Sequence, residues 1–165
     1  METTISRRNF LKVSALSGGG MLVSFSLLNE VSAAMPMEEA VFTPNIYIKI
    51  SSSGRIVLMA PNPEIGQGVK TSHPMIIAEE LCVDWKKIQV ELAPLDSKFG
   101  RQTAGGSGSI RGRFSELRTL GATAREMLVT AAAQTLNVQR AECTAEDGFV
   151  MHKASGRKLS YGELA

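Results

Sequence analysis

The chain has 165 residues, of which 44% are apolar and 21% are charged, and its net charge is +2. This composition is typical of a globular domain, because disordered chains have fewer large apolar residues and multi-span membrane proteins have longer apolar runs. Removal of residues 1–33 takes away three basic and two acidic residues and leaves 15 against 14. A protein that binds phosphate backbones needs clustered Lys and Arg on one face, so no nucleic-acid partner is expected.

The first 33 residues have the three parts of a twin-arginine export signal. Residues 6–12 read S-R-R-N-F-L-K, residues 13–28 are weakly apolar and contain three glycines, and residues 31–33 suit a cleavage site. A positively charged N-terminal part, an apolar middle and small residues at the cleavage site define a signal peptide. The middle is too short and too weakly apolar for a stable membrane span. We therefore expect a removable signal over residues 1–33, use of the twin-arginine translocase and a periplasmic location.

This export route bears on function because it carries cargo that is already folded. Proteins need it most often when a cofactor must be inserted before export, so the signal favours a bound cofactor. Proteins without a cofactor also use this route, either because they fold fast or because a partner bears the signal. The signal alone leaves both explanations open.

The first half of the remaining chain predicts a hairpin, a helix and a strand. Residues 34–44 hold two prolines and no period, so they are expected to be a surface lead-in to a domain over residues 45–165. Residues 45–50 alternate and residues 55–60 are apolar, which predicts two strands joined by a turn. A helix is expected from Thr71 or Ser72, and a strand is expected over residues 85–93.

The second half predicts a loop, a long helix and a second hairpin. Residues 98–112 contain five glycines and no apolar period, which is typical of a loop. A helix is expected from Ser115, because apolar residues recur at helical spacing up to Leu136. Residues 142–145 and 149–152 predict a hairpin, and residues 160–163 resemble the beginning of another helix. The predicted fold is α+β, with short β-hairpins packed in two layers with two main helices, and we expect it to be an incomplete part of a larger domain.

Two glycine-rich loops each lead into a predicted helix. The first is Gly66-Gln67-Gly68, and the second is Gly105-Gly106-Ser107-Gly108-Ser109. Glycine lets backbone amides approach a ligand closely, and a helix N-terminus offers unpaired N–H groups to an anion. Arg111 and Arg113 would add charge beside the second loop. The loops therefore suit a phosphate or diphosphate, although a plain turn and a flexible linker remain the alternatives for the first and second loop.

The remaining candidate groups favour structural roles. His73 and His152 have no partner at ligand spacing and are expected to be surface or hydrogen-bonded histidines. Cys82 and Cys143 lie 61 positions apart and outside any CxxC pattern, which disfavours a zinc site. The expected compartment permits a disulfide, but the chain order gives no geometry for one, so two buried small side chains are favoured. Glu79 and Glu80 are adjacent on a helix, where neighbours point about 100° apart, so they are not expected to form an acid/base pair.

Several motifs in order resemble a known family. They are E-I-G-Q-G-V-K-T at residues 64–71, I-A-E-E-L at residues 77–81, V-D-W at residues 83–85 and G-G-S at residues 105–107 followed by I-R at residues 110–111. Together these segments resemble the molybdopterin-binding subunit of the xanthine dehydrogenase and aldehyde oxidase family, of the isoquinoline 1-oxidoreductase beta-subunit type. The resemblance extends from the signal to Ala165.

The resemblance implies a molybdenum hydroxylase. In such proteins a molybdopterin cytosine dinucleotide holds the molybdenum, water supplies the oxygen, and electrons leave through [2Fe–2S] clusters on a small partner subunit, with cytochrome c as a further acceptor. Carried over to this sequence, Gly66, Gln67 and Gly68 would contact the pterin. The dinucleotide would be held by residues of the second loop, namely Gly105, Gly106, Ser107, Ser109 and Arg111.

Two departures from the family are visible. Gly108 stands where the family has a larger residue. The glutamate that acts as base near the metal lies toward the C-terminus of the much longer family members, so no catalytic residue and no metal ligand is expected in these 165 residues. An exported non-enzymatic binding module that folds alone and pairs with a partner is the alternative function.

Overall fold

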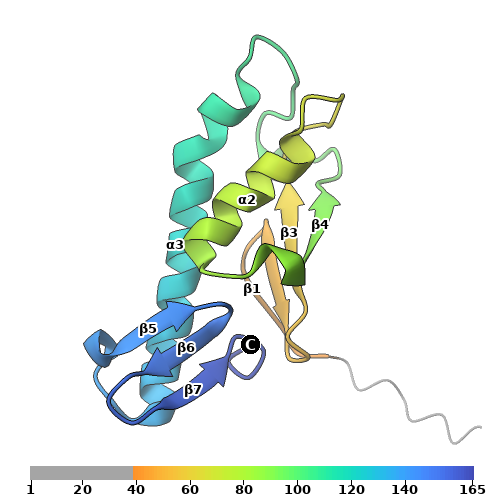
Figure 1. Cartoon of the computed structure of the whole chain (residues 1–165). Coiled ribbons are helices and arrows are strands. Elements are labelled where there is room, and N and C mark those ends of the chain that lie inside the picture. The colour runs from red at the N-terminus through yellow and green to blue at the C-terminus, as the bar shows by residue number, and fades with distance from the viewer. Residues whose placement is uncertain (1–38) are drawn as a thin grey trace, which may run out of the picture. The chain divides into compact units, whose positions relative to one another are not determined.

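The computed structural model describes residues 39–165, and the predicted signal and residues 34–38 lie outside them (Figure 1). These residues form two sheets and two long helices, an α+β fold as expected. The strands of the first sheet are β1 (Val41–Asn45), β2 (Ile48–Ser51), β3 (Ile56–Ala60) and β4 (Ile88–Leu92). The helices are α2 (Val69–Leu81) and α3 (Ser109–Leu136), and the second sheet contains β5 (Cys143–Glu146), β6 (Phe149–His152) and β7 (Arg157–Ser160).

The predicted first hairpin is confirmed and lies at the centre of the first sheet. Strands β2 and β3 pair antiparallel, with Ile48 opposite Leu58, in a sheet of order β1-β2-β3-β4. The prediction of a lead-in is wrong for residues 41–44, because β1 begins at Val41 and pairs with β2. Pro44 is compatible with this strand because β1 lies at the sheet edge, where a missing N–H breaks no ladder.

The last pair of the first sheet is parallel and places two loops at one end. Strand β4 runs parallel to β3, with Ile56 opposite Ile88 and Ala60 opposite Leu92. Parallel neighbours need a crossover connection, which α2 supplies. The predicted strand over residues 85–93 is confirmed in part, since residues 85–87 form a 3-10 turn. The chain therefore leaves β3 and β4 at the same end of the sheet, where ligands commonly bind in such units.

Both helices begin earlier than the sequence predicts. Helix α2 begins at Val69, before Thr71, and α3 begins at Ser109, six residues before Ser115. The first turns of α3 carry Ile110 and Phe114 in exposed positions, so no apolar stripe marks them in the sequence. The predicted loop over residues 98–112 is correspondingly shorter, and residues 97–99 form a 3-10 turn.

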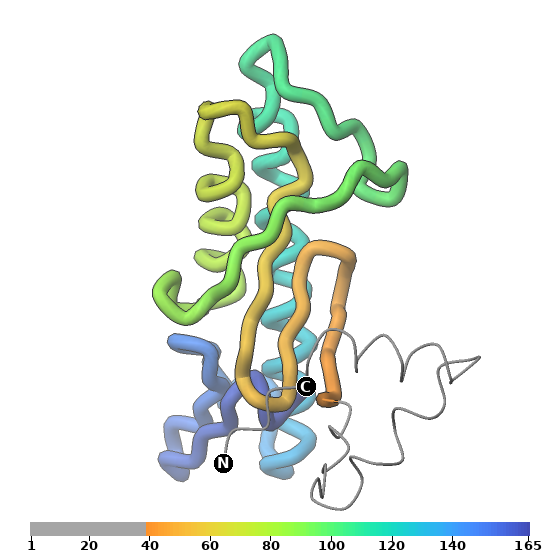
Figure 2. Tube along the Cα trace, turned by 90° about the vertical axis from the view of Figure 1, so that its right-hand side faces the viewer, coloured from red at the N-terminus to blue at the C-terminus, as the bar shows by residue number. Residues whose placement is uncertain are grey.

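Helices α2 and α3 lie side by side on one face of the first sheet and run in the same direction (Figures 1 and 2). Gly121 lies at their crossing, where a Cβ atom would stand 2.7 Å from the carbonyl oxygen of Ile77. On either side of Gly121, Arg118 and Arg125 of α3 form ion pairs with Glu80 of α2. The two N-terminal helix ends consequently lie at the same end of the molecule, next to the loops that follow β3 and β4.

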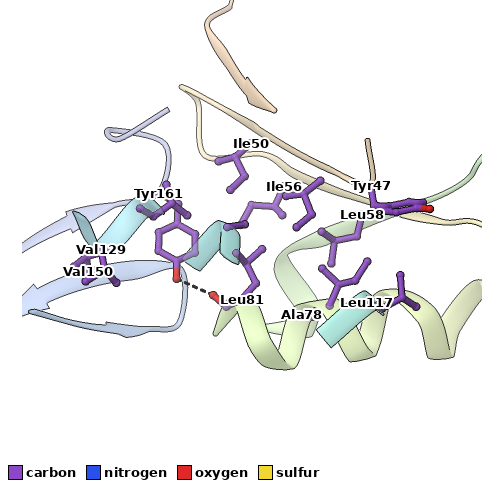
Figure 3. Packing of buried hydrophobic residues seen from close by; sticks show 14 of the residues in the cluster. Tyr47, Ile50, Ile56, Leu58, Ala78, Leu81, Leu117, Val129, Val150 and Tyr161 are labelled. Atoms are coloured by element: carbon purple, nitrogen blue, oxygen red, sulfur yellow. Dashed lines mark hydrogen bonds between the residues drawn. The ribbon is translucent and has the colours of Figure 1, made fainter. Parts of the chain in front are cut away.

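The second sheet packs against the C-terminal half of α3 and corrects one prediction. The predicted hairpin is confirmed as β5 and β6, but a third strand, β7, follows it. Residues 161–164 form a turn and not a helix, because Tyr161 is buried and its hydroxyl donates to the Leu81 carbonyl at 2.7 Å (Figure 3). Gly162 follows at a close approach, since a Cβ atom there would lie 2.7 Å from the amide nitrogen of Gly54.

The core joins the two sheets through the helices. Figure 3 shows Ile50 and Ile56 of the first sheet facing Tyr161 and Leu81. Cys143 is buried in this core as predicted, whereas Cys82 is only half-buried because it lies at the C-terminal end of α2, and both are free thiols.

The helix crossing gives a stability test. We expect Gly121→Ala to destabilise the fold by about 1–3 kcal/mol, because the new methyl group would overlap the Ile77 carbonyl and would crowd the Glu80 side chain. Gly112→Ala on the same helix is the control, because a Cβ atom there has open space, and it should be neutral or slightly stabilising. Urea unfolding of both variants measures the difference. Equal stability of the two variants would contradict the close crossing.

Candidate functional site

The loops that follow β3 and β4 are tied together by side-chain amides. Gln102 donates through its Nε2 atom to the carbonyl oxygens of Pro61 and Pro94, at 3.0 and 2.9 Å, and its Oε1 atom accepts from the Asp96 amide at 2.9 Å. Asn62 donates through Nδ2 to the Thr103 carbonyl at 2.7 Å. These contacts place the second glycine loop beside the end of β3.

The first glycine loop is organised by a carboxylate of its own. Glu64 accepts the amides of Gly66 and Gly68 on Oε1, at 2.7 and 3.0 Å, and the amide of Lys70 on Oε2 at 2.9 Å. Gly66 and Gly68 adopt positive φ angles of 94° and 82°, which turn successive N–H groups toward one point. Glu64 therefore occupies the anion position at the start of α2.

This arrangement changes the predicted role of the first loop. Gly66, Gln67 and Gly68 are exposed, but the two glycine amides are already paired with Glu64. The Gln67 side chain also turns back into the loop, where it accepts from the Ile65 amide and donates to the Pro63 carbonyl. These hydrogen bonds leave the first loop without the free amides that the sequence suggested. Contact of these residues with a pterin stays a prediction.

Glu64 gives a pH-dependent test. The hydrogen bonds from the Lys70 and Gly68 amides lower the pKa of Glu64 below its ordinary 4.5. Its ionised form therefore stabilises the fold above pH 4.5, and this contribution is lost as the pH falls through the lower folded-state pKa. We expect Glu64→Gln to lower the melting temperature at pH 7, and we expect the gap from the wild type to close in acid.

The control for this experiment is Glu79→Gln, which removes an exposed carboxylate from α2, the helix that follows the Glu64 loop. It should leave the melting temperature nearly unchanged at each pH. A constant gap between Glu64→Gln and the wild type from pH 7 to pH 3 would show that the carboxylate charge does not hold the loop.

The second glycine loop lines an open cleft of about 720 Å³ at the start of α3. Gly105, Gly106, Gly108 and Ser109 are part of its wall, and cofactor binding by Gly105, Gly106 and Ser109 stays a prediction. Gly105 and Gly106 would have open space around a Cβ atom, so the loop leaves room for a ligand. The other lining residues are Asn62, Arg101, Thr103, Gly112, Arg113 and Glu116.

The first amides of α3 have no side-chain acceptor within residues 39–165, whereas Glu64 accepts amides at the start of α2. The N-cap residue of α3 is Gly108, and no side chain of residues 39–165 caps it. The first amides of a helix have no intrahelical partner and carry part of the positive end of the helix dipole. Arg101 lies in the same wall, and the carboxylate Glu116 is paired with Arg113 at 3.0 Å. The cleft therefore presents unpaired donors and positive charge to an anion.

The two arginines of the sequence prediction have different surroundings. Arg113 is largely buried and donates to the carbonyls of Phe99 and Arg101, at 2.6 and 3.1 Å, so it holds the loop in place. Arg111 is exposed and is not part of the cleft wall. Ser107 is also exposed and adopts a positive φ of 51°. A ligand contact of Arg111 or Ser107 stays a prediction.

His73 is a residue of this site that the sequence did not reveal. It lies in the first turns of α2, is fully buried, and places Nε2 3.1 Å from the Ser109 carbonyl oxygen. A carbonyl only accepts, so Nε2 carries the proton. Burial lowers the pKa of His73 and keeps the ring neutral. The other ring nitrogen has no partner within residues 39–165, so the expected pairing is only half met.

Asn62 and Glu64 were missed as well. The only signal for Asn62 is its place between two prolines directly after a strand, where an amide side chain must supply the hydrogen bonds that proline cannot. Glu64 precedes the glycine pair, and nothing in its spacing distinguishes it from a solvent-exposed acid.

His152 lies at the other end of the molecule, where Nδ1 meets Ser155 Oγ at 2.7 Å.

The described part of the chain holds no metal cluster and no membrane-spanning helix. Within residues 39–165 no three His, Cys, Asp or Glu side chains gather in a way that would hold a metal ion. In the same part of the chain no helix combines the length and apolarity of a membrane span.

A comparison with protein families identifies the fold. The model of the molybdopterin cofactor-binding domain matches residues 18–165. The chain belongs to this family. The resemblance found in the sequence is therefore confirmed. The cleft at the start of α3 lies within the residues that match this molybdopterin-binding domain.

Curated relatives support the assignment. The beta subunit of isoquinoline 1-oxidoreductase from Brevundimonas diminuta is 32% identical over 97% of this chain and 22% of its own length. A membrane-bound aldehyde dehydrogenase from Gluconacetobacter polyoxogenes, whose name gives pyrroloquinoline-quinone, is 29% identical over 99% of this chain and 21% of its own length. The chain thus spans about a fifth of the length of these relatives.

Solved structures show the same fold at lower identity. Quinoline 2-oxidoreductase from Pseudomonas putida 86 matches with a TM-score of 0.57 and 21% identity, over 71% of this chain and 15% of that chain. Reconstituted CO dehydrogenase from Oligotropha carboxidovorans matches with a TM-score of 0.56 and 21% identity, over 72% of this chain and 15% of that chain. The α+β arrangement of residues 39–165 is therefore shared with parts of larger oxidoreductases.

Proposed function

We propose that this chain forms part of a subunit of a periplasmic molybdenum hydroxylase, which binds a molybdopterin cytosine dinucleotide. The whole enzyme would oxidise an aldehyde or an N-heteroaromatic substrate with oxygen from water. The observation that carries the proposal is the uncapped start of α3 at a positively charged, glycine-lined cleft. Membership of the molybdopterin-binding family names the kind of anion that such a cleft would receive.

The residues of the cleft fit the phosphate-bearing part of this cofactor. Ser109, the first residue of α3, lies in the cleft wall, and the first amides of a helix have no intrahelical partner. Arg101 of the same wall adds a positive charge. Gly105 and Gly106 hold the position close to these donors free of side chains. When bound, the cofactor would supply the two-electron oxidation chemistry of its molybdenum.

In this proposal the residues of the cleft bind and orient the cofactor. Glu116, the carboxylate of the cleft wall within residues 39–165, is paired with Arg113. From the family resemblance, we place the catalytic base in the part of the enzyme that corresponds to the C-terminal region of the longer family members. The partners that follow from this proposal are a small subunit with [2Fe–2S] clusters and a cytochrome c acceptor, and the names of the relatives describe subunits of larger enzymes.

Cofactor analysis tests the proposal directly. The full-length protein is purified from the periplasmic fraction of its host, and molybdenum is measured by mass spectrometry together with the fluorescence of oxidised pterin. We expect close to one molybdenum and one pterin per polypeptide, with CMP released on hydrolysis. Pyrroloquinoline-quinone without pterin would favour the quinone of the Gluconacetobacter relative's name, and absence of every cofactor would favour a non-enzymatic binding module.

A substitution at the helix start tests where the anion binds. We expect Gly108→Asp to lower the molybdenum and pterin content several-fold, because its carboxylate would add a negative charge at the start of α3 and would repel a phosphate. Gly108→Asn is the matched control, because its side chain has nearly the same size without the charge, and it should keep most of the cofactor. Equal loading of the two variants would place the anion elsewhere.

A further inference from the structure

The first turns of α3 are not positioned by the hydrophobic core. The first buried apolar residue of the helix is Leu117, whereas Ile110 and Phe114 are 37% and 45% exposed. The close crossing with α2 lies at Gly121, about 18 Å along the axis from Ser109 at a rise of 1.5 Å per residue. Packing alone therefore leaves the end that carries the free amides without an apolar anchor.

Polar contacts hold this end instead. Within residues 39–165, Arg113 ties it to the carbonyls of Phe99 and Arg101, which belong to the loop itself. The contact of His73 with the Ser109 carbonyl joins it to α2. Arg113 also donates through Nη1 to the hydroxyl of the buried Tyr47 at 3.3 Å, which links the helix to the first hairpin. The contact of His73 is the one of these that joins the start of α3 to the start of α2.

His73 is well suited to this task because its own position is fixed. The side chain is fully buried, and the imidazole ring has only two rotatable bonds. Its Nε2–H group is directed at a carbonyl of the first residue of α3, one residue after the N-cap Gly108. The ring thus sets the distance between the start of α2, which Glu64 has capped, and the start of α3, which has no internal cap.

We propose that His73 is a positioning residue of the cofactor site, whose Nε2–H donor holds the uncapped start of α3 in the place where its amides meet the anionic part of the ligand. His73 itself does not touch the ligand. The inference rests on the proposed function for the identity of the ligand, but the positioning of α3 is a property of the chain alone.

The experiment uses three variants of the full-length protein, produced in a host that cannot make molybdopterin. His73→Gln places an amide N–H at nearly the reach of Nε2, His73→Asn is one methylene shorter, and His73→Leu has no donor. Hydrogen–deuterium exchange is followed over residues 105–112 and over residues 117–136, and the affinity for inorganic diphosphate is measured by calorimetry.

We expect exchange over residues 105–112 to rise in the Asn and Leu variants and to be restored in the Gln variant. Exchange over residues 117–136 should not change. The Asn and Leu variants should bind diphosphate about five- to tenfold more weakly than the wild type, the factor expected for loss of one hydrogen bond, and the Gln variant should recover most of the affinity.

Two outcomes would overturn the inference. If the Gln variant behaves like the Leu variant, or if all three variants exchange faster over both segments, His73 acts only as a packed side chain. If the variants exchange like the wild type, the His73 contact does not position α3. These results are independent of the cofactor analysis, because an absence of molybdenum and pterin in the native protein would remove the proposed function without changing the exchange pattern.

Discussion

Two parallel helices with their N-terminal ends side by side impose the main constraint on this structure. The crossing at Gly121 brings α2 and α3 together, and the contact between His73 and Ser109 keeps their first turns adjacent. Each helix end carries about half a positive charge, and like charges in proximity repel. A carboxylate of the chain offsets this repulsion at the start of α2 but not at the start of α3, and the candidate site lies at the start of α3.

The first helix end is neutralised from within the chain and the second is open. Glu64 accepts three amides at the start of α2, so this end is a finished structural element. At the start of α3 a glycine stands at the N-cap, and Glu116, the carboxylate of the cleft wall, is paired with Arg113. An external anion would complete the second end as Glu64 completes the first. This comparison within one molecule is the strongest physical argument that the cleft receives a phosphate-bearing ligand.

The sequence predicts the parts of the fold that local patterns determine. The hairpin of β2 and β3, the hairpin of β5 and β6, and the long stripe of α3 from Leu117 onward all follow from periodicity and turn residues. Strand β1 was missed because Pro44 reads as an interruption, although an edge strand tolerates it. The parallel pairing of β3 and β4 joins residues about thirty positions apart, and no local pattern encodes it.

The candidate site was predicted by its glycines and missed in its polar contacts. The sequence singled out the loop of Gly105 and Gly106, which lines the cleft, because a glycine-rich segment is visible in the sequence. The roles of Glu64 and His73 depend on which atoms their side chains reach in three dimensions. The early start of α3 was missed for the same reason, because its first turns are held by hydrogen bonds and not by an apolar face.

The parallel arrangement of the helices also governs how an anion would reach the cleft. Two aligned dipoles and the guanidinium of Arg101 add their fields at one end of the molecule, and Glu64 offsets only the share of α2. The resulting field extends into the solvent over roughly one Debye length, about 8 Å at physiological ionic strength. Capture of a charged ligand would consequently be fast in dilute buffer and would slow as salt is added.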